Sequence, residues 1–249
     1  MKRIILSGCC GKMGHMISDC IKERNDCTLV AGIDITGTAY DAFPVFTSPS
    51  ECSVEADVMI DFSHPSALES LLSYARTQKL PTVIATTGLS QDQIKQIEET
   101  AQYIPLFFSF NMSLGINLLC ELAKKAAAVL DGQFDIEIVE KHHNRKLDAP
   151  SGTALMLADE VSSVLKEQPR YVYDRHSVRQ KRGKEEIGIH SIRGGTIVGE
   201  HEVIFAGRDE IITLSHTAMS REVFATGSVN AALFLCEKEN GLYNMGDLV

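Results

Sequence analysis

Short apolar runs alternate with helical patterns over the first 110 residues, and this alternation constrains the fold more than any other feature. The runs are rich in Val, Ile and Leu, without regular polar interruptions, which is typical of strands in a parallel sheet covered on both faces. The pattern therefore predicts a doubly wound α/β domain. The predicted strands span 3–6, 28–33, 58–60, 82–85 and 106–110, and predicted helices cover 13–23 and begin near 64 and 90.

The pattern changes after Asn111. Long helices are predicted at 113–130 and 151–165, and strands cluster at 134–139, 186–193, 202–206 and 210–216. Strands grouped in this way favour an α+β domain with an open antiparallel or mixed sheet. The last helical pattern, 221–238, is expected to pack back on the first domain. We therefore predict one domain from residues 1–112 with 222–249, and a second from 113–221.

Composition excludes several classes of protein. The hydrophobic fraction of 44% and the charged fraction of 23% are those of globular proteins, and no apolar run is long enough to span a bilayer. The net charge of −9, without a long basic stripe, argues against nucleic-acid binding. Seven scattered cysteines without a C-x-x-C pair suit a reducing compartment. We expect a cytoplasmic protein without a membrane or nucleic-acid partner.

A glycine-rich loop follows the first predicted strand. Gly8, Gly11 and Gly14 lie in the turn that leads into a helix, where backbone N–H groups can approach a pyrophosphate. Asp34 ends the second strand, at the place where an acidic residue accepts hydrogen bonds from the adenosine ribose. The pattern favours a dinucleotide site. The alternative is a steric cluster of turn glycines with an unrelated surface Asp.

Asp34 also bears on the choice of cofactor. It is followed by Ile35 and Thr36, so no Arg stands beside it to hold a 2′-phosphate, which the carboxylate itself repels. NADH is therefore favoured over NADPH. Lys12 projects from the loop and could reach a phosphate, which acts in the opposite direction.

A polar cluster spans residues 137–154. His142 and His143 lie among Lys141, Arg145 and Lys146, and Pro150 to Thr153 then open a helix. A helix start with hydroxyl groups and a nearby Lys suits an anionic group such as a carboxylate, and His can transfer protons near neutral pH. A metal site and a purely structural basic loop are the alternatives. The two histidines lack a third ligand at a recognisable spacing, so we predict no metal.

The same stretch resembles a known family, the dihydrodipicolinate (4-hydroxy-tetrahydrodipicolinate) reductases of lysine and diaminopimelate biosynthesis. The family's E-x-H-H-x-x-K-x-D-A-P-S-G-T-A signature is matched by Glu140 to Ala154. The likeness continues over nearly the whole chain, in segments 8–14, 61–63, 86–88, 111–115, 199–202 and 241–245.

The resemblance implies an NAD(P)H-dependent reduction of a cyclic, unsaturated dicarboxylate to tetrahydrodipicolinate, and a homotetramer built through the second domain. It implies that His142 is the proton donor/acceptor and Lys146 a second proton donor. It also implies substrate binding at His143, Gly152 and Thr153, to which the helix start adds Ser151. The implied cofactor positions are Gly8, Cys9, Cys10, Gly11, Lys12, Met13, Asp34, Ala85, Thr86, Thr87, Ser109, Phe110, Asn111 and Met112.

Two other functions fit part of the sequence. Another Rossmann-type dehydrogenase would explain the first domain but not the cluster around His142 and Lys146. A non-enzymatic NADH-sensing regulator would need a partner-binding module, such as a DNA-reading helix pair, and the sequence contains no such pattern.

Overall fold

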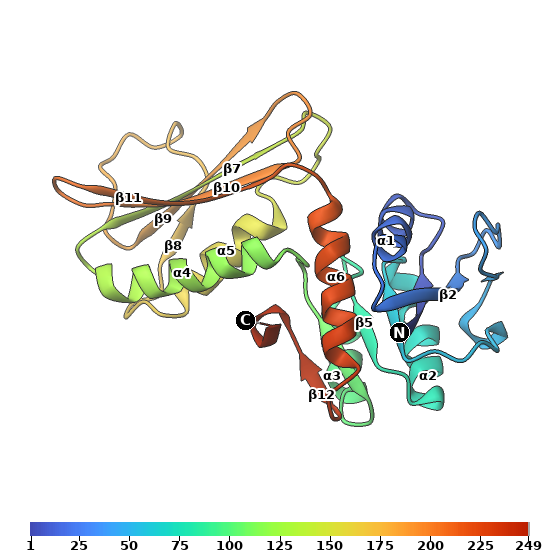
Figure 1. The fold of residues 1–249 in the computed structure, drawn as a ribbon. Coiled ribbons are helices and arrows are strands. Elements are labelled where there is room, and N and C mark those ends of the chain that lie inside the picture. The colour runs from blue at the N-terminus through green and yellow to red at the C-terminus, as the bar shows by residue number, and fades with distance from the viewer. Residues whose placement is uncertain (249) are drawn as a thin grey trace. The chain divides into compact units, whose positions relative to one another are not determined.

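The structure is a computed structural model and describes residues 1–248. The chain forms two compact units, shown in Figure 1. Unit 1 contains residues 1–114 and the C-terminal segment from Arg221, and unit 2 contains Gly115–Ser220.

Unit 1 is built on a parallel seven-stranded sheet with the order β12-β6-β5-β4-β1-β2-β3. The order reverses direction at β1, whose two neighbours are β2 and β4, and ligands of such sheets bind outside the carboxyl ends of the strands at this point. The strands are β1 (Lys2–Ser7), β2 (Cys27–Ile33), β3 (Val45–Phe46), β4 (Val58–Asp61), β5 (Thr82–Ile84), β6 (Pro105–Phe108) and β12 (Gly241–Tyr243).

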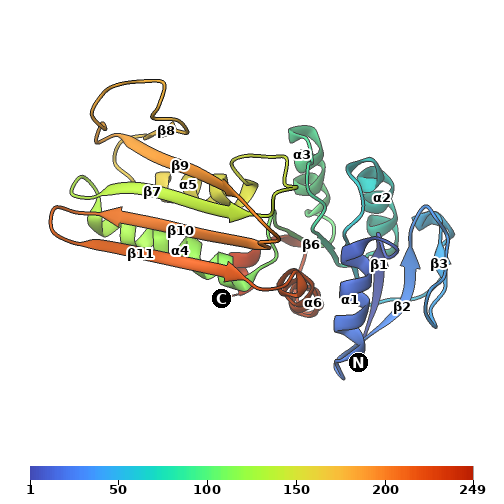
Figure 2. The same cartoon turned by 90° about the horizontal axis from the view of Figure 1, so that it is seen from above.

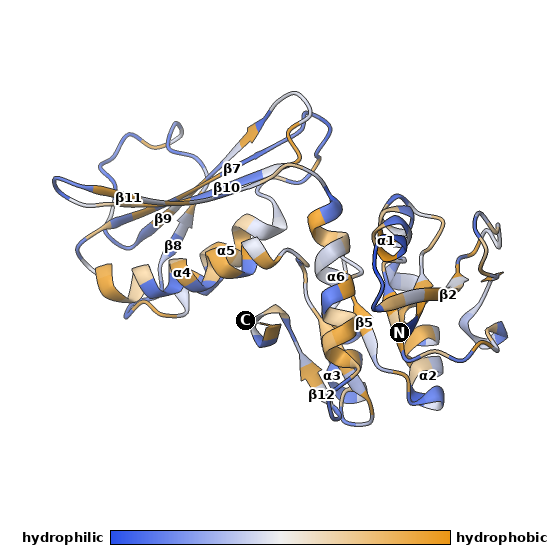
Figure 3. Cartoon of the chain, in the orientation of Figure 1, coloured by the Kyte–Doolittle hydropathy of each residue, from blue (hydrophilic) through white to orange (hydrophobic). Residues whose placement is uncertain are grey.

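Helices cover both faces of this sheet, because successive side chains of each strand point to opposite sides. On β1, Ile4 and Leu6 are buried in the core with α1 and α6, and Ile5 is buried in the core with α2 and α3. The hydropathy colouring of Figure 3 shows the apolar strands and helix faces. The helices are α1 (Lys12–Lys22), α2 (Leu68–Gln78), α3 (Gln91–Thr100) and α6 (Glu222–Leu235), with short 3₁₀ turns at Pro49–Glu51, Pro65–Ala67 and Met245–Leu248.

Helix α6 returns the chain to unit 1. Ala225, Val229 and Ala232 are fully buried in the core that α1 covers. Gly227 permits the close approach, because a Cβ at this position would collide with the carbonyl oxygen of Met112. The C-terminal helix is therefore an integral part of the first core.

Unit 2 is a mixed five-stranded sheet with the order β11-β10-β7-β9-β8 (Figure 2). β10 runs antiparallel to β7 and β11, whereas β7, β9 and β8 are parallel. Apolar side chains of β7, β9 and β10 form one core with α4 and α5 on one face of the sheet. The elements are α4 (Leu114–Leu130), β7 (Asp135–His142), α5 (Gly152–Ser162), β8 (Arg170–Val172), β9 (Glu186–Arg193), β10 (Gly199–Ala206) and β11 (Ile211–Ala218).

The predicted fold class is confirmed, including the parallel doubly wound sheet and the mixed second sheet. The sequence pattern missed β3, β8 and β12, which have only two or three residues each. It also ended β7 too early, at Val139, whereas the strand continues to His142. Within residues 1–248, no helix has the length and apolar character that crossing a bilayer requires.

Candidate active site

The glycine loop lies between β1 and α1. Gly8 has a φ of +75°, and a Cβ there would collide with the backbone of Phe62; a Cβ at Gly14 would collide with the carbonyl oxygens of Gly8 and Cys9. Protein packing alone therefore requires these two glycines. Helix α1 has no side-chain cap at Gly11 and no acidic residue in its first turn. Its N-terminal N–H groups and dipole favour an anion at this end of the helix.

Asp34 lies beside this loop, immediately after β2. Its Oδ2 accepts the backbone N–H of Cys10 at 3.1 Å. Its Oδ1 accepts both the N–H and the hydroxyl of Thr36, at 3.0 and 2.9 Å. The carboxylate is half-buried and fixed, whereas Lys12, the first residue of α1, is exposed. The fold therefore holds Asp34 against the glycine loop, and Lys12 begins the helix that follows this loop.

Sequence reasoning gave no site role to Asp61, a buried acid that joins the ends of β4 and β5. The side chain is 1% exposed; its Oδ2 accepts the Thr86 hydroxyl at 2.7 Å and its Oδ1 accepts the Ser63 N–H at 3.2 Å. Burial raises the pKa of this carboxyl group. Asp61 thus fixes the predicted cofactor residue Thr86, while Thr87 next to it is exposed.

The remaining predicted cofactor residues divide by burial. Cys9, Ala85 and Met112 are buried in the core that α1 and α6 cover. Ser109 and Asn111 fix their own turn: the Ser109 hydroxyl donates to the Asn111 carbonyl at 2.8 Å and accepts its N–H at 3.2 Å. The exposed Phe110 ring packs edge-on against Phe108, with centroids 4.9 Å apart. Cys10 is half-buried in the loop, and Met13 is half-buried in the first turn of α1.

In unit 2, the buried carboxylate of Glu140 organises the His142 region. Glu140 and His142 are two residues apart on β7 and so point to the same side of the strand. His142 Nδ1 lies 2.6 Å from Glu140 Oε2, and two guanidinium nitrogens of Arg193 contact the two carboxylate oxygens, each at 2.7 Å. Burial raises the pKa of Glu140, but the hydrogen bonds from Arg193 and His142 outweigh it and bring the pKa to about 2.

This arrangement determines the tautomer of His142. An ionised carboxylate only accepts hydrogen bonds, so Nδ1 carries the proton that Glu140 accepts, and Nε2 is the atom that gains or loses a proton. Burial lowers the pKa of His142 and the hydrogen bond to Glu140 partly restores it, with a net shift below the ordinary value. Gly199 leaves space at the reactive atom, because a Cβ there would lie 3.2 Å from Nε2.

His201 is a second buried histidine that sequence reasoning did not assign to the site. Its ring packs edge-on against that of His142, with centroids 5.2 Å apart, and its Nε2 lies 3.1 Å from the Ser151 hydroxyl. Burial and the neighbouring His142 lower the pKa of His201 to about 3. His201 is therefore neutral at pH 7 and supports the ring of His142 and the start of α5.

Among the predicted substrate residues, Ser151 is the N-cap of α5. It is 2% exposed, and its hydroxyl accepts the Ala154 N–H at 3.2 Å as well as contacting His201. Both contacts of the Ser151 hydroxyl are therefore with other groups of this chain. Gly152 is exposed at the helix start, and Thr153 and His143 are half-buried.

Lys146 lies on the loop between β7 and α5. Its Nζ forms an ion pair with Asp148 Oδ2 at 2.9 Å, with 22% of the Lys side chain exposed. The backbone N–H of Lys146 donates to the His143 carbonyl at 3.1 Å, which fixes the turn. The end of β7 and the loop after it therefore carry His142, His143 and Lys146 in the same segment that leads to the start of α5.

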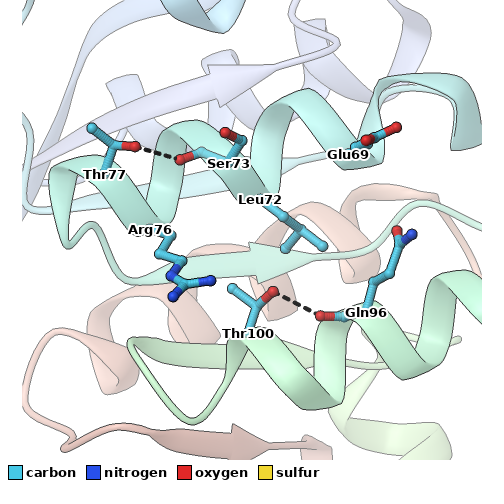
Figure 4. Close-up of a pocket in the computed structure, with 7 residues that line it drawn as sticks. All are labelled: Glu69, Leu72, Ser73, Arg76, Thr77, Gln96 and Thr100. Atoms are coloured by element: carbon cyan, nitrogen blue, oxygen red, sulfur yellow. Dashed lines mark hydrogen bonds between the residues drawn. The ribbon is translucent and has the colours of Figure 1, made fainter.

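A groove of about 440 Å³ lies on unit 1, between α2 and α3 (Figure 4). The Thr77 and Thr100 hydroxyls in it donate to carbonyl oxygens of their own helices. None of the residues predicted for the site lines it. The lining residues are Glu69, Leu72, Ser73, Arg76, Thr77, Gln96 and Thr100.

The buried histidines predict an acid-labile fold. Folded His201 stays neutral down to about pH 3, whereas in the unfolded chain it becomes protonated near pH 6.5. Each pH unit below 6.5 therefore favours the unfolded chain by about 1.4 kcal/mol for this one proton. Glu140 contributes a further loss only as the pH falls from 4.5 toward 2. The free energy of unfolding is thus expected to fall from pH 6.5 downward.

Between pH 6.5 and 4.5 the lowered pKa of Glu140 adds little to this slope, whereas the raised pKa of the buried Asp61 acts in the opposite direction to the histidines. His142 and His216, whose pKa values burial also lowers, contribute to the same slope. His201→Gln should reduce the slope by one proton, measured by urea unfolding at several pH values. An unchanged slope would mean that His201 titrates alike in the folded and unfolded chain.

The fold defines a class of protein together with two groups of residues: the glycine loop with Asp34, and the Glu140–His142 pair with Lys146. This class is a two-domain oxidoreductase with a Rossmann-type first domain. Family models identify it further. "Dihydrodipicolinate reductase, N-terminus" matches residues 2–112 and "Dihydrodipicolinate reductase, C-terminus" matches residues 115–249. The chain belongs to the dihydrodipicolinate reductase family, which confirms the resemblance seen in the sequence.

Individual relatives agree with this assignment. The 4-hydroxy-tetrahydrodipicolinate reductase of Caldanaerobacter subterraneus subsp. tengcongensis is 55% identical over 100% of this chain and 98% of the relative. The protein of the same name from Clostridium novyi is 51% identical over the same shares. A solved dipicolinate-bound dihydrodipicolinate reductase from Paenisporosarcina is 26% identical, covers 98% of this chain and 97% of its own, and superposes with a TM-score of 0.82.

Proposed function

We propose that this chain reduces 4-hydroxy-tetrahydrodipicolinate to tetrahydrodipicolinate with a pyridine nucleotide, in lysine and diaminopimelate biosynthesis. Full-length relatives at 45–55% identity bear the name of this activity. The single structural observation that carries the proposal is the loop of unit 2 that presents His142, paired with a buried carboxylate, together with Lys146 and the start of α5. A dianionic substrate needs these cations and N–H donors.

The proposed chemistry divides between the two units. Unit 1 binds the pyridine nucleotide, which supplies a hydride to one ring carbon when it is bound. Unit 2 binds the substrate: Thr153, the N–H groups at the start of α5 and His143 hold a carboxylate. The 4-hydroxyl of the substrate leaves as water together with a neighbouring ring hydrogen, and the hydride and a proton add to the double bond that this loss completes. Lys146 Nζ delivers the proton to the carbon next to the hydride acceptor, and His142 gains or loses a proton at Nε2 while Glu140 stabilises its charged form.

A ternary complex tests this function against its rivals. Pyridine-2,6-dicarboxylate is a stable planar mimic of the substrate, and a reductase should bind it together with NADH. A coupled assay that generates the substrate in situ should also show loss of NADH or NADPH. A sensor would bind NADH and ignore the mimic, and a different dehydrogenase would ignore both the mimic and the substrate. Either result would overturn the proposal.

We propose that NADH is the preferred cofactor, by about tenfold in kcat/KM. NADPH brings a phosphate of charge near −2 against Asp34, which costs about 1–3 kcal/mol when partly desolvated. Lys12 is exposed, and a single flexible lysine in solvent recovers about 1 kcal/mol or less. Asp34→Ser should narrow or reverse the preference and Lys12→Ala should widen it, measured as kcat/KM for both cofactors. A wild-type preference for NADPH would contradict this ranking.

We also propose a homotetramer, assembled through the face of the unit 2 sheet that α4 and α5 leave uncovered. The strand register places apolar side chains on this face, among them Val139, Ile192, Ile204 and Ile211, and Ile192 and Ile211 are 47% and 69% exposed. Ile204→Lys should shift the sedimentation coefficient from tetramer toward smaller species, whereas Lys125→Ala on α4 should not. A monomeric wild-type chain would contradict the proposal.

The proposed compartment is the reducing cytoplasm. Seven cysteines lie within residues 1–248, and all seven are unpaired. Free thiols persist where thioredoxin and glutathione keep them reduced.

A further inference from the structure

Two thiols and a carboxylate meet in the glycine loop of unit 1. The sulfur atoms of Cys9 and Cys10 are 3.9 Å apart, and one ligand atom each from Cys9, Cys10 and Asp34 lies within 4.8 Å of the others. Asp34 reaches the pair because the loop is fixed to the end of β2, where Gly8 N–H donates to the Ile33 carbonyl at 2.8 Å. We call these three residues the thiol–carboxylate cluster.

The sulfur–sulfur distance fits one shared metal ion. A disulfide would bring the two atoms to about 2.05 Å, so the pair is not bonded. Zinc–sulfur bonds of about 2.3 Å at tetrahedral angles place two sulfurs about 3.8 Å apart. The observed 3.9 Å therefore needs almost no rearrangement. A carboxylate oxygen is a normal third ligand, and a water completes such a site.

We propose that Cys9, Cys10 and Asp34 bind one thiophilic divalent cation of the zinc class, and that this cation and the pyridine nucleotide exclude each other. The mutual exclusion rests on the proposed function, because it assumes that Asp34 binds the pyridine nucleotide. The cation site itself does not depend on that function. Binding forms two metal–thiolate bonds and one metal–carboxylate bond, and the two thiol protons leave to solvent without any change in oxidation state.

Exclusion follows from the shared carboxylate. In the proposed cofactor site Asp34 accepts hydrogen bonds from the ribose hydroxyls, and a cation on the same oxygen atoms replaces those bonds. Cys10 and Asp34 are half-buried, whereas the Cys9 side chain is 0% exposed. The ion thus enters from the side of Cys10 and Asp34, which is also the side the nucleotide would occupy.

Two histidine–carboxylate pairs elsewhere in the chain are less suited to a cation than the thiol–carboxylate cluster. Glu137 lies 2.7 Å from His190, but Arg175 and Arg182 contact the same carboxylate at 3.0 and 2.9 Å. Glu140 is held by the two terminal nitrogens of the Arg193 guanidinium and belongs to the site already described. In the thiol–carboxylate cluster, by contrast, no cationic side chain forms a hydrogen bond or ion pair with Asp34 among the contacts of residues 1–248. The prediction of no metal site considered residues close in sequence, whereas Asp34 is distant in sequence from the two cysteines that it lies beside.

Cobalt provides a direct readout of the ligands. Co²⁺ added to the full chain, reduced and freed of added thiols, should give a thiolate-to-cobalt charge-transfer absorption that saturates at one equivalent, and Zn²⁺ should abolish it. Cys10→Ser should remove this absorption and Asp34→Asn should weaken it. Cys20→Ser is the matched control, because Cys20 is a half-buried thiol on α1 outside the cluster. Thermal unfolding of each variant checks its fold.

Nucleotide binding tests the exclusion. In wild type, Zn²⁺ at ten times its own Kd should raise the apparent Kd for NADH about tenfold, as expected for mutually exclusive ligands. The same Zn²⁺ concentration should leave the NADH affinity of Cys10→Ser unchanged. Absence of the charge-transfer absorption, or its persistence in Cys10→Ser, would overturn the cation site, and an NADH affinity unaffected by bound Zn²⁺ would overturn the exclusion. A chain that binds no NADH even without metal would contradict the proposed function, while the cobalt spectrum would still decide the cation site.

Discussion

Replacing His142 with Gln is expected to lower kcat about 100-fold, the usual effect of losing a general acid–base group. The amide of Gln can still donate to Glu140, so the hydrogen bond that fixes the side chain in the structure has a substitute. Gln cannot gain or lose a proton at the position of Nε2. KM and melting temperature should therefore remain close to those of the wild-type chain, because the loss is confined to the transition state.

Two further variants make the result specific. His143→Gln should act mainly on KM, since His143 is proposed to bind substrate rather than move protons. His176→Gln should have no effect, because His176 is exposed and belongs neither to the glycine loop nor to the segment that carries His142 and Lys146. Steady-state kinetics and thermal unfolding of the three variants separate these roles. A His142→Gln enzyme with wild-type kcat would contradict the assignment of His142.

The central strands of unit 1 could be predicted because β4 and β5 are buried at every residue. All four residues of β4 are buried, so an apolar run such as Val58–Ile60 has no alternative interpretation as an exposed segment. β3 and β12 could not be predicted, because two or three residues carry no period. These strands exist through pairing with β2 and β6, which is a tertiary effect.

The end of β7 shows why polar inward positions defeat a hydrophobic pattern. Glu140 and His142 are buried on the same side as Ile136 and Ile138, and the apolar alternation therefore appears to end at Val139. The burial is tolerated because Arg193 and the Ser151 N–H satisfy the Glu140 carboxylate. A polar group at a core position is expensive unless such partners are present, and nothing local in the sequence reveals them.

The site was predictable only in its contiguous part. The spacing of Glu140, His142 and Lys146 could be seen in one stretch, whereas His201 enters through strand register. Register pairs His201 on β10 with Glu140 on β7, and places β9, which carries Arg193, on the other side of β7. Since register depends on the whole sheet, the sequence alone could not assign these two partners to the His142 region.

Lys146→Ala is expected to lower kcat/KM by about 100-fold or more, through both parameters. A charge-assisted contact to a substrate carboxylate contributes about 1.5–3 kcal/mol, and its loss raises KM; loss of a proton source lowers kcat as well. The affinity for pyridine-2,6-dicarboxylate, measured by calorimetry in the presence of NADH, should fall by about 10- to 100-fold. This mimic reports the binding contribution separately, because it undergoes no reaction.

The resting partner of Lys146 sharpens this experiment. Asp148 pairs with the Lys146 ammonium at 2.9 Å, so a bound carboxylate must compete with it. Asp148→Asn should therefore tighten binding of the mimic, by at most about fivefold because the pair is partly exposed to solvent. In the Lys146→Ala background the same change should have no effect. Lys141→Ala is the matched control, since Lys141 pairs with Glu200 and Glu202 instead. If affinity for the mimic is unchanged in Lys146→Ala, Lys146 does not contact the substrate carboxylate, and only a role in proton delivery would remain for it.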